Sequence, residues 1–262
     1  MGSLSHAFAV CAYKESPFLT DCLDSIFAQT QNSEVFIATS TPSPYLSDIA
    51  ERYSIPLYAG THRSGIGRDW NYAYSQAKAD WVTIAHQDDI YLPTYTERIL
   101  TSVSEATDPI VAYTDYAELR DGVEVTDNTL LTIKRLMNTV LIPEAAQRSQ
   151  FVRRRVLSLG LPSSTPSVAY NRQRFPDLKF DEEMKVSLDW DMMERLSNEP
   201  GQFVYIPYIL LQHRVHKESE TTAAIGRGDR HAEDYEMYRR YWPVPIAKMF
   251  ANQYARSYAS NS

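Results

Sequence analysis

Two adjacent carboxylates, Asp88 and Asp89, follow an apolar segment at residues 81–85 that has the length and composition of a buried strand. In open α/β sheets, ligands bind outside the carboxyl ends of the strands, which makes this pair a candidate site. Adjacent carboxylates repel each other unless a cation or hydrogen-bond donors stabilise them. Mn²⁺ or Mg²⁺ bound to a diphosphate meets this need, because both ions prefer oxygen ligands. Capping of the following helix is the alternative interpretation.

A second acidic pair, Asp189 and Asp191, opens a segment at 188–196 that we expect to be helical. Residues two apart point to different sides of a helix, so one carboxylate can face a site while the other caps the helix or faces solvent. Further along, His213 and His216 have a spacing that could bind zinc on a helix, but the surrounding residues indicate a strand and a turn. A zinc site is therefore not predicted.

The elements that must position these residues alternate along the first half of the chain. Segments typical of strands at 7–13, 35–38, 56–59, 81–85 and 110–114 are separated by segments whose apolar residues have helical spacing. This order predicts an α/β fold with a mostly parallel sheet flanked by helices. Later we expect a hairpin at Asp121-Gly122, one or two strands at 203–212 broken at Pro207, and a tyrosine-rich helical tail from residue 229 onward.

The composition is that of an ordinary globular protein. Of the 262 residues, 44% are hydrophobic and 23% charged, which is too apolar for a disordered chain. The net charge of −7 argues against a nucleic-acid polymer as partner, because phosphate backbones favour basic surfaces. Apolar runs are strand-sized, and neither a membrane span nor a secretory signal is visible. Cys11 and Cys22 fit reduced core positions. We therefore expect a soluble, cytoplasmic protein.

Four stretches together resemble the family 2 glycosyltransferases, over roughly residues 6–222. Their order and spacing are more specific than any one of them. They are Ala12-Tyr13-Lys14-Glu15 with Leu19, Leu23, Ser25, Ile26, Gln29 and Thr30; Gly65, Arg68, Asn71 and Ala77 with the run at 81–89; the acidic motif at 189–196; and His213-Arg214-Val215-His216 with Ser219. The resemblance implies a GT-A fold, a nucleotide-binding α/β sheet followed by an acceptor-binding half.

The resemblance also implies roles for residues around the donor. Tyr13 and Glu15 would lie at the nucleoside, and Arg68 would approach the phosphates. Asp88 would hydrogen-bond the ribose, while Asp89 would ligate Mn²⁺ or Mg²⁺ on the diphosphate. The cofactor predicted for this chain is therefore one divalent cation, which would stabilise the departing diphosphate as a Lewis acid.

On the acceptor side, the resemblance makes Asp189 the general base that deprotonates the acceptor hydroxyl, with Asp191 as the alternate. The segment carrying Arg214 and His216 would close over the donor, with Arg214 contacting the nucleotide sugar. A role of His216 as a further ligand of the metal is an alternative that stays open.

The chain departs from the family pattern at two positions. Many relatives carry an Asp pair after the second strand that helps to bind the base, whereas residues 38–43 contain no acid, so Thr39 and Ser40 only mark that position. Uridine recognition therefore does not follow from the resemblance. His86 occupies a position that is often acidic; it either contacts the metal or diphosphate, or is a helix-capping or core histidine.

We expect one glycosyltransferase domain at 1–222, with a nucleotide-sugar half at 6–115 and an acceptor half at 116–222, and a helical tail at 223–262. The predicted activity is inverting transfer of a sugar from a nucleotide-diphosphate sugar to a hydroxyl of a glycan or lipid-linked acceptor, in surface polysaccharide or glycoconjugate synthesis. A sugar-1-phosphate nucleotidyltransferase is an alternative, but residues 11–18 lack the glycine-rich loop such enzymes need. A non-catalytic nucleotide- or glycan-binding module is the other, disfavoured by the two acidic motifs.

Two further features have competing interpretations. Arg153-Arg154-Arg155 could meet an anionic lipid-linked acceptor or the inner face of the membrane, but a solvated helix face is favoured. The aromatic residues of the tail could stack on sugars or form a homodimer contact, but packing against the main domain is favoured.

Overall fold

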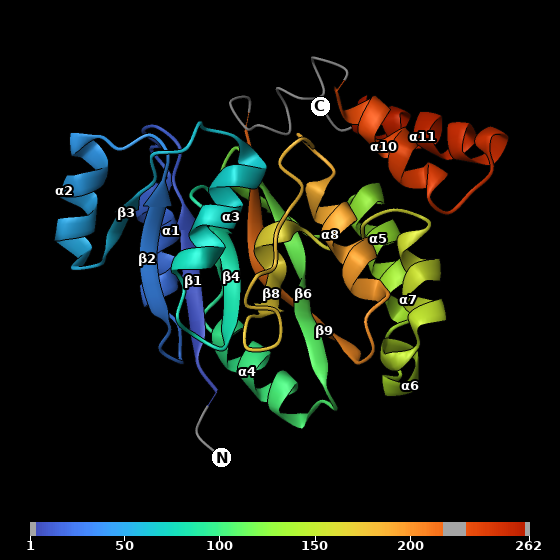
Figure 1. The fold of residues 1–262 in the computed structure, drawn as a ribbon, viewed down its shortest axis with the longest axis horizontal. Helices are drawn as coiled ribbons and strands as arrows, with labels where there is room; N and C mark the ends of the chain where they lie inside the picture. Colours follow the sequence, from blue (N-terminus) through green and yellow to red (C-terminus); the bar gives the residue numbers. More distant parts are fainter. Residues whose placement is uncertain (1–3, 217–228, 260–262) are drawn as a thin grey trace.

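The computed structural model describes residues 4–216 and 229–259. They form a nine-stranded mixed sheet with helices on both faces (Figure 1). Along the sheet the order is β3-β2-β1-β4-β8-β6-β9-β5, and β7 pairs with β6 at the side. The predicted α/β class with a mostly parallel sheet and C-terminal helices is confirmed.

The first four strands are parallel and build the amino-terminal half of the sheet. Their carboxyl ends lie together, so the loops that follow β1, β2 and β4 share one edge. The strands are β1 (His6–Cys11), β2 (Glu34–Thr39), β3 (Leu57–Ala59) and β4 (Trp81–His86), joined through α1 (Leu19–Phe27), α2 (Pro44–Tyr53) and α3 (Ile66–Gln76).

The later strands extend the sheet and partly reverse its direction. The strand β8 pairs antiparallel with both β4 and β6, whereas β9 runs parallel to β6. The predicted hairpin joins β6 to β7, and Asp121 and Gly122 have the left-handed φ values, 48° and 80°, that a tight hairpin turn requires. The strands are β5 (Ile90–Tyr91), β6 (Pro109–Arg120), β7 (Val123–Val125), β8 (Val168–Asn171) and β9 (Gln202–Val215).

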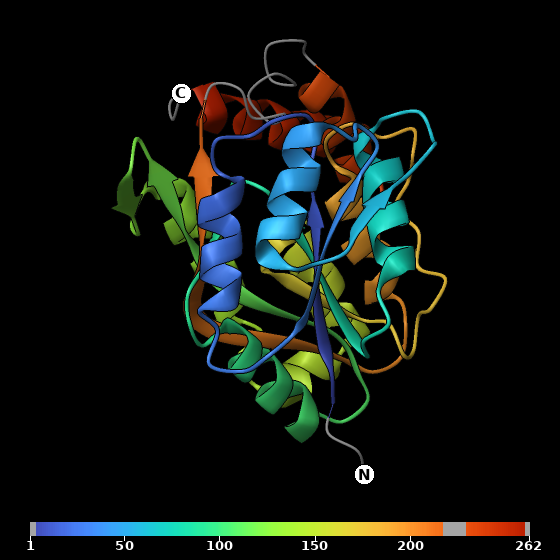
Figure 2. The same ribbon diagram turned by 90° about the vertical axis from the view of Figure 1, so that its left-hand side faces the viewer.

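Most of the remaining helices pack along the later strands, and α10 and α11 lie at the end of the sheet toward which β1 points (Figures 1 and 2). They are α4 (Tyr95–Glu105), α5 (Thr129–Thr139), α6 (Glu144–Arg148), α7 (Gln150–Leu157), the short 3₁₀ helix η1 (Thr165–Ser167), α8 (Leu188–Ser197), α10 (Asp229–Arg239) and α11 (Val244–Ala259). The predicted boundary at residue 222 lies outside the described residues.

The two faces of the sheet are covered by different helices because side chains alternate along each strand. On β1, Phe8 and Val10 join the core beneath α1, α2 and α4. Ala7 and Ala9 face the opposite core, where their small size admits bulky residues of α3 such as Trp70. Each strand therefore contributes side chains to both cores, and its carboxyl end is held between helices on both faces of the sheet.

The alternative of two separate strands is wrong, because β9 continues through Pro207 as one strand with an irregularity there. The pairing with β6 shifts register there: Thr114 pairs with Ile206, and Asp115 pairs with Ile209. This bulge leaves Pro207 and Tyr208 outside the ladder, which accommodates a residue that has no backbone N–H. The strand then runs on to Val215 and carries its last residues to the Asp88-Asp89 loop.

Packing of the C-terminal aromatic residues against the main domain is confirmed for Tyr238. Its side chain is buried, its ring lies edge-on to Trp190 at 4.9 Å, and it stacks on Phe250 at 5.4 Å. Trp242 also donates its indole N–H to the Ser158 carbonyl of α7 at 2.8 Å. These contacts attach α10 and α11 to α7 and α8.

The basic run at 153–155 is neither a solvated face nor a patch open to anionic lipids. Arg153 is fully buried, Arg154 forms an ion pair with Glu194 at 2.5 Å, and only Arg155 is exposed, stacked over Trp242 at 5.2 Å. Helical geometry explains the difference, because consecutive residues point about 100° apart and cannot share one face. Among the described residues, no helix is long and apolar enough to cross a membrane.

The buried guanidinium of Arg153 has a structural role at the carboxyl end of α8. It donates to four carbonyl oxygens that would otherwise lack partners: those of Gln147 (3.3 Å), Ser197 (3.0 Å), Glu199 (2.7 Å) and Gly201 (2.5 Å). Its planar fork reaches several acceptors at once. Burial lowers the pKa of Arg153 to about 10, so the group stays charged at neutral pH.

We expect Arg153→Met to lower the free energy of unfolding by about 3 kcal/mol, because it leaves buried carbonyls without a donor. Arg155→Met, in the same helix but exposed, should cost less than about 1 kcal/mol. Urea unfolding followed by circular dichroism measures both. Equal losses in the two variants would contradict the structural role of Arg153.

Candidate active site

The Asp88-Asp89 loop lies where the carboxyl end of β4 meets the last residues of β9. Asp89 is fully buried, and its Oδ1 accepts hydrogen bonds from His213 Nδ1 and from the backbone N–H of Arg214, both at 2.9 Å. Its Oδ2 is buried and has no hydrogen-bond partner among the described residues. The end of β9 therefore covers this carboxylate.

Asp88 is held by the same end of β9. Its Oδ2 lies 2.8 Å from His216 Nε2, and its backbone carbonyl accepts from Arg214 Nε at 2.9 Å. The Arg214 guanidinium lies 4.2 Å from the ring centre of Phe18 and pairs with Asp21 at 3.1 Å. Arg214, expected at the nucleotide sugar, thus links β9, the acidic loop and the start of α1.

The charges of this cluster are balanced internally. Burial would lower the pKa of His213, but the adjacent charge of Asp89 and the hydrogen bond to it raise that pKa to about 9. His213 is therefore an imidazolium at neutral pH and forms a buried ion pair with Asp89. For Asp88, burial acts to raise the pKa, but the His216 hydrogen bond and nearby imidazoles hold it below its usual value. Asp88 can therefore stay ionised.

The residues fit a divalent cation. His86, Asp88 and Asp89 each offer a ligand atom, and these atoms lie within 4.8 Å of one another. Two ligands at about 2.2 Å from one ion lie at most about 4.4 Å apart, so a small inward movement brings all three onto one ion. The unpartnered Oδ2 of Asp89 is the strongest sign of a missing ligand, since buried polar atoms are rarely left unpaired.

The expected nucleoside contacts lie at the carboxyl end of β1. The ring of Tyr13 and the side chain of Glu15 are exposed there. The amide of Gln87 bonds the backbone of Tyr13 in both directions, accepting from its N–H at 3.1 Å and donating to its carbonyl at 3.2 Å. Gln87, which the sequence did not single out, therefore ties the end of β1 to the acidic loop.

Thr39 is not available as a surface contact, because its side chain is buried. Its hydroxyl accepts from the backbone N–H of Thr41 at 2.9 Å, and the Thr41 hydroxyl accepts from the N–H of Lys14 at 2.7 Å. Lys14 has a left-handed φ of 57°, so this bond helps to fix the turn that presents Tyr13. The neighbouring Ser40 hydroxyl is buried without a partner among the described residues.

Arg68 lies on α3 and contacts the loop before α8. Its guanidinium is 3.3 Å from Glu182 and 3.7 Å from Glu183. The helix approaches this loop closely, since a Cβ added at Gly67 would lie 2.6 Å from the Asp181 carbonyl oxygen. Arg68, expected at the donor phosphates, thus pairs with two carboxylates of the loop that precedes Asp189.

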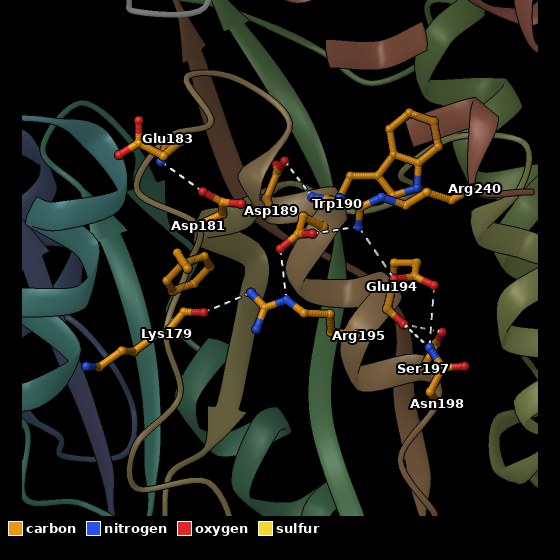
Figure 3. A network of polar contacts seen from close by, with 12 residues as sticks. Lys179, Asp181, Glu183, Asp189, Trp190, Glu194, Arg195, Ser197, Asn198 and Arg240 are labelled. Carbon is orange, nitrogen blue, oxygen red and sulfur yellow. Dashed lines mark hydrogen bonds and ion pairs between the residues drawn. The ribbon is translucent and has the colours of Figure 1, made fainter. Parts of the chain in front are cut away.

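The acidic motif of α8 divides into two different environments (Figure 3). Asp189, in the first turn, is half-buried; it accepts from the Thr165 hydroxyl at 2.9 Å and from the Trp190 N–H at 2.8 Å. Asp191 is buried and pairs with Arg195 at 2.9 Å and Arg240 at 2.6 Å. The interpretation that the second carboxylate caps the helix or faces solvent is wrong.

Thr165 is the clearest residue that sequence reasoning missed. It belongs to η1, which precedes β8 in the chain and lies beside β4 and β6 in space. The carbonyl of its neighbour Pro166 accepts a hydrogen bond from the Tyr91 hydroxyl at 2.9 Å, and Tyr91 lies two residues after Asp89. Through these contacts Asp189 and the Asp88-Asp89 loop share one rigid support. Burial lowers the pKa of His86, and the negative charges of Asp89, Asp88 and Asp189 partly oppose this shift.

Comparison with known proteins decides the family. The model of glycosyl transferase family 2 matches residues 8–172, more than half of the chain and including the acidic loop. This chain belongs to glycosyltransferase family 2. Helix α8 and strand β9 lie beyond the matched residues, so the match does not reach Asp189 or His213. No curated protein matches the chain significantly.

Solved structures show the same fold. TarS residues 1–349 from S. aureus, in complex with UDP-GlcNAc, superposes with a TM-score of 0.67 at 15% identity, over 95% of this chain and 70% of that one. The mannosyltransferase PcManGT from Pyrobaculum calidifontis, in complex with GDP-Man and Mn²⁺, gives 0.60 at 15% identity, over 97% and 69%. The chain covers 42% of the longer TarS structure. At these identities the family 2 neighbours show the fold alone.

The two environments of the acidic motif predict unequal losses of stability. Asp191→Asn should lower the free energy of unfolding by about 2 kcal/mol, because it removes the buried charge that Arg195 and Arg240 bind. Asp189→Asn should cost less than about 1 kcal/mol, since an amide oxygen still accepts from Thr165. Thermal and urea unfolding test this. A larger loss for Asp189→Asn would reverse the assignment of the structural carboxylate.

Proposed function

We propose that this chain is an inverting glycosyltransferase that moves a sugar from a nucleotide-diphosphate sugar to a hydroxyl of a glycan or lipid-linked acceptor, in surface polysaccharide or glycoconjugate synthesis. The observation that carries the proposal is the family 2 fold with two separate carboxylate sites, one beside imidazoles and one half-exposed. Such a division suits a reaction that needs a cation at the leaving group and a base at the acceptor.

The donor would bind across the carboxyl ends of β1 and β4. The exposed Tyr13 ring and the Glu15 carboxylate would lie at the nucleoside, and Asp88 at the ribose or at the cation. Because residues 38–43 contain no acid, the sequence does not indicate which nucleobase the donor carries. UDP-GlcNAc and GDP-Man, which the structural neighbours bind, are therefore the first donors to compare.

The diphosphate end of the donor would meet the His86-Asp88-Asp89 cluster. Mn²⁺ or Mg²⁺ held there would supply the positive charge that stabilises the departing nucleotide diphosphate. Asp89 would use Oδ2 toward the ion while Oδ1 keeps His213 and Arg214 in place. Arg68 would reach the phosphates only by leaving Glu182 and Glu183, so we expect it to act chiefly in holding the loop before α8.

The base would be Asp189. Its two hydrogen bonds, from the Thr165 hydroxyl and the Trp190 N–H, fix the carboxylate while it remains partly exposed. A carboxylate held in this way can accept the proton of an acceptor hydroxyl as that oxygen attacks the anomeric carbon. One displacement with one base inverts the anomeric configuration. Asp191 cannot take this role while it is enclosed by Arg195 and Arg240.

A panel of nucleotide sugars tests the donor class before the acceptor is known. The protein is incubated with UDP and GDP sugars, with and without Mn²⁺, and released nucleotide is measured. Slow, metal-dependent hydrolysis of one donor is the expected result. No release from any donor, together with tight binding of one of them, would favour a non-catalytic binding module instead.

Asp189→Asn tests the base directly. We expect turnover to fall by about 10²-fold or more, because a general base contributes about 10²- to 10⁴-fold, while donor affinity stays within a few-fold. Turnover with the acceptor and calorimetric donor binding are measured on the same preparation. NMR of the product should show the inverted configuration. Retention, or normal turnover of the variant, would overturn the proposed mechanism.

A further inference from the structure

Lys134 lies beside the segment that holds the proposed base. It extends from α5 toward β6, and its ammonium donates to the Tyr116 hydroxyl at 2.9 Å and to the Ser163 carbonyl at 3.2 Å. Ser163 precedes Thr165 by two residues, and the Thr165 hydroxyl donates to Asp189 at 2.9 Å. The ammonium of Lys134 and the carboxylate of Asp189 are therefore bound to the same short stretch of chain.

Tyr116 connects Lys134 to the acidic loop as well. The Lys134 ammonium lies 5.2 Å from the centre of the Tyr116 ring, and that ring is edge-on to His213 with centres 6.2 Å apart. His213 in turn pairs with Asp89. A continuous series of contacts thus runs from the loop after β4 through Lys134 to the segment that supports Asp189.

The positive charge of Lys134 has no carboxylate partner within the part of the chain that the structure describes. An ammonium has three N–H donors, and the two acceptors of Lys134 are neutral oxygens. The buried Glu118 accepts instead from Arg120 at 2.8 Å and from Asn128 at 2.7 Å. Asp189 accepts from neutral donors. The charge of the ammonium and one of its donors are therefore left for a group that the described residues do not provide.

Two further observations point to a ligand at this position. Lys134 is half-buried, and burial lowers its pKa, although the charge of Asp189 acts in the opposite direction. The Ser163 hydroxyl is buried and has no hydrogen-bond partner among the described residues. Buried charges are almost always paired, and buried hydroxyls are almost always hydrogen-bonded. A group with anionic oxygens is the ligand that suits both a lysine ammonium and a serine hydroxyl.

The position of Lys134 favours the acceptor over the donor as the source of this anion. In the proposed function a cation at the Asp88-Asp89 loop neutralises the donor diphosphate, whereas Lys134 shares its support with the base that faces the acceptor. The protein offers anions no broad basic surface here, since its net charge is −7 and the run at 153–155 is largely buried or paired. An anionic acceptor would therefore need a local cation of this kind.

We propose that Lys134 binds a phosphate or carboxylate that the acceptor carries close to the hydroxyl to be glycosylated, so that the site selects anionic acceptors over neutral ones. The inference rests on the proposed function and names the acceptor class of the same site. The bonds from Lys134 to Tyr116 and Ser163 hold the ammonium in place, so little side-chain freedom is lost when the anion binds.

Binding of acceptor fragments tests the inference without any turnover. Glucuronate is compared with glucuronamide, its neutral analogue of nearly the same shape, and glycerol phosphate is compared with glycerol. Dissociation constants are measured by NMR titration of protein saturated with UDP or GDP and Mg²⁺, which keeps the donor site occupied. We expect each anion to bind at least about 10-fold more tightly than its neutral analogue, because charge-assisted hydrogen bonds are the stronger ones.

Variants of Lys134 separate its charge from a purely structural role. Lys134→Met should reduce the preference for the anion to about twofold or less, whereas Lys134→Arg should retain most of it because the guanidinium keeps the charge. The matched control is Lys78→Met, which removes an exposed charge before the amino end of β4 and should leave the preference unchanged. Circular dichroism and the urea midpoint check that each variant is folded.

A measurement on the wild-type protein covers the case in which Lys134→Met does not fold. With ¹⁵N-labelled lysine, the Nζ resonance of Lys134 should shift on addition of glucuronate and stay in place on addition of glucuronamide. Equal shifts with both compounds, or none with either, would contradict binding of the anion by this ammonium.

The remaining outcomes separate this inference from the function on which it rests. Wild-type protein that prefers neither anion overturns the inference and leaves glycosyl transfer to a neutral acceptor standing. If a folded Lys134→Met variant keeps the preference and instead binds UDP and GDP about 10-fold more weakly, the anion is the donor diphosphate and the inference is wrong. Failure of every donor to release nucleotide counts against the proposed function alone, because the preference for anions is measured without turnover.

Discussion

The buried ion pair between Asp89 and His213 is the interaction on which the rest of the site depends. Residues 124 positions apart are joined by it, and the Arg214 N–H bonds the same oxygen. A carboxylate that is fully buried needs both a charge and donors to stay ionised, and β9 supplies them. The end of β9 is thereby fixed against the loop after β4, so residues from the amino-terminal and carboxyl-terminal halves of the sheet meet at the Asp88-Asp89 loop.

This constraint accounts for several features that look unrelated in the sequence. The bulge at Pro207 lets β9 remain paired with β6 up to Val215, which brings His213 to Asp89. Arg214 then reaches past Asp88 to Phe18 and Asp21 on the other side of the loop. On the opposite flank, η1 joins the acidic loop to α8 through the hydrogen bond from Tyr91 to Pro166 and that from Thr165 to Asp189.

The sequence predicted those features that depend on local order. The apolar run at 81–85 and the acids behind it mark a strand and its carboxyl end wherever the strand lies, and the four-part resemblance gave the family. It could not predict choices made by distant partners. Three consecutive arginines suggest an exposed helix face, but Arg153 is buried and donates to the carbonyls of Ser197 and Glu199 at the end of α8. Asp191 looks like a helix-start acid in the sequence, but it pairs with Arg240, the residue that follows α10. Thr165 becomes a candidate only through its hydrogen bond to Asp189, and the stacking of His86 on Trp70 likewise depends on the fold.

The contrast between the two acids of α8 shows how burial divides roles within one motif. Asp191 forms ion pairs with Arg195 of α8 and with Arg240, which follows α10, so it stabilises the junction between these two helices. Asp189 has only neutral donors, Thr165 and the Trp190 N–H, and remains partly exposed. Because the ion pairs of Asp191 anchor the first turn of α8, the half-buried carboxylate of Asp189 is held in place without being enclosed.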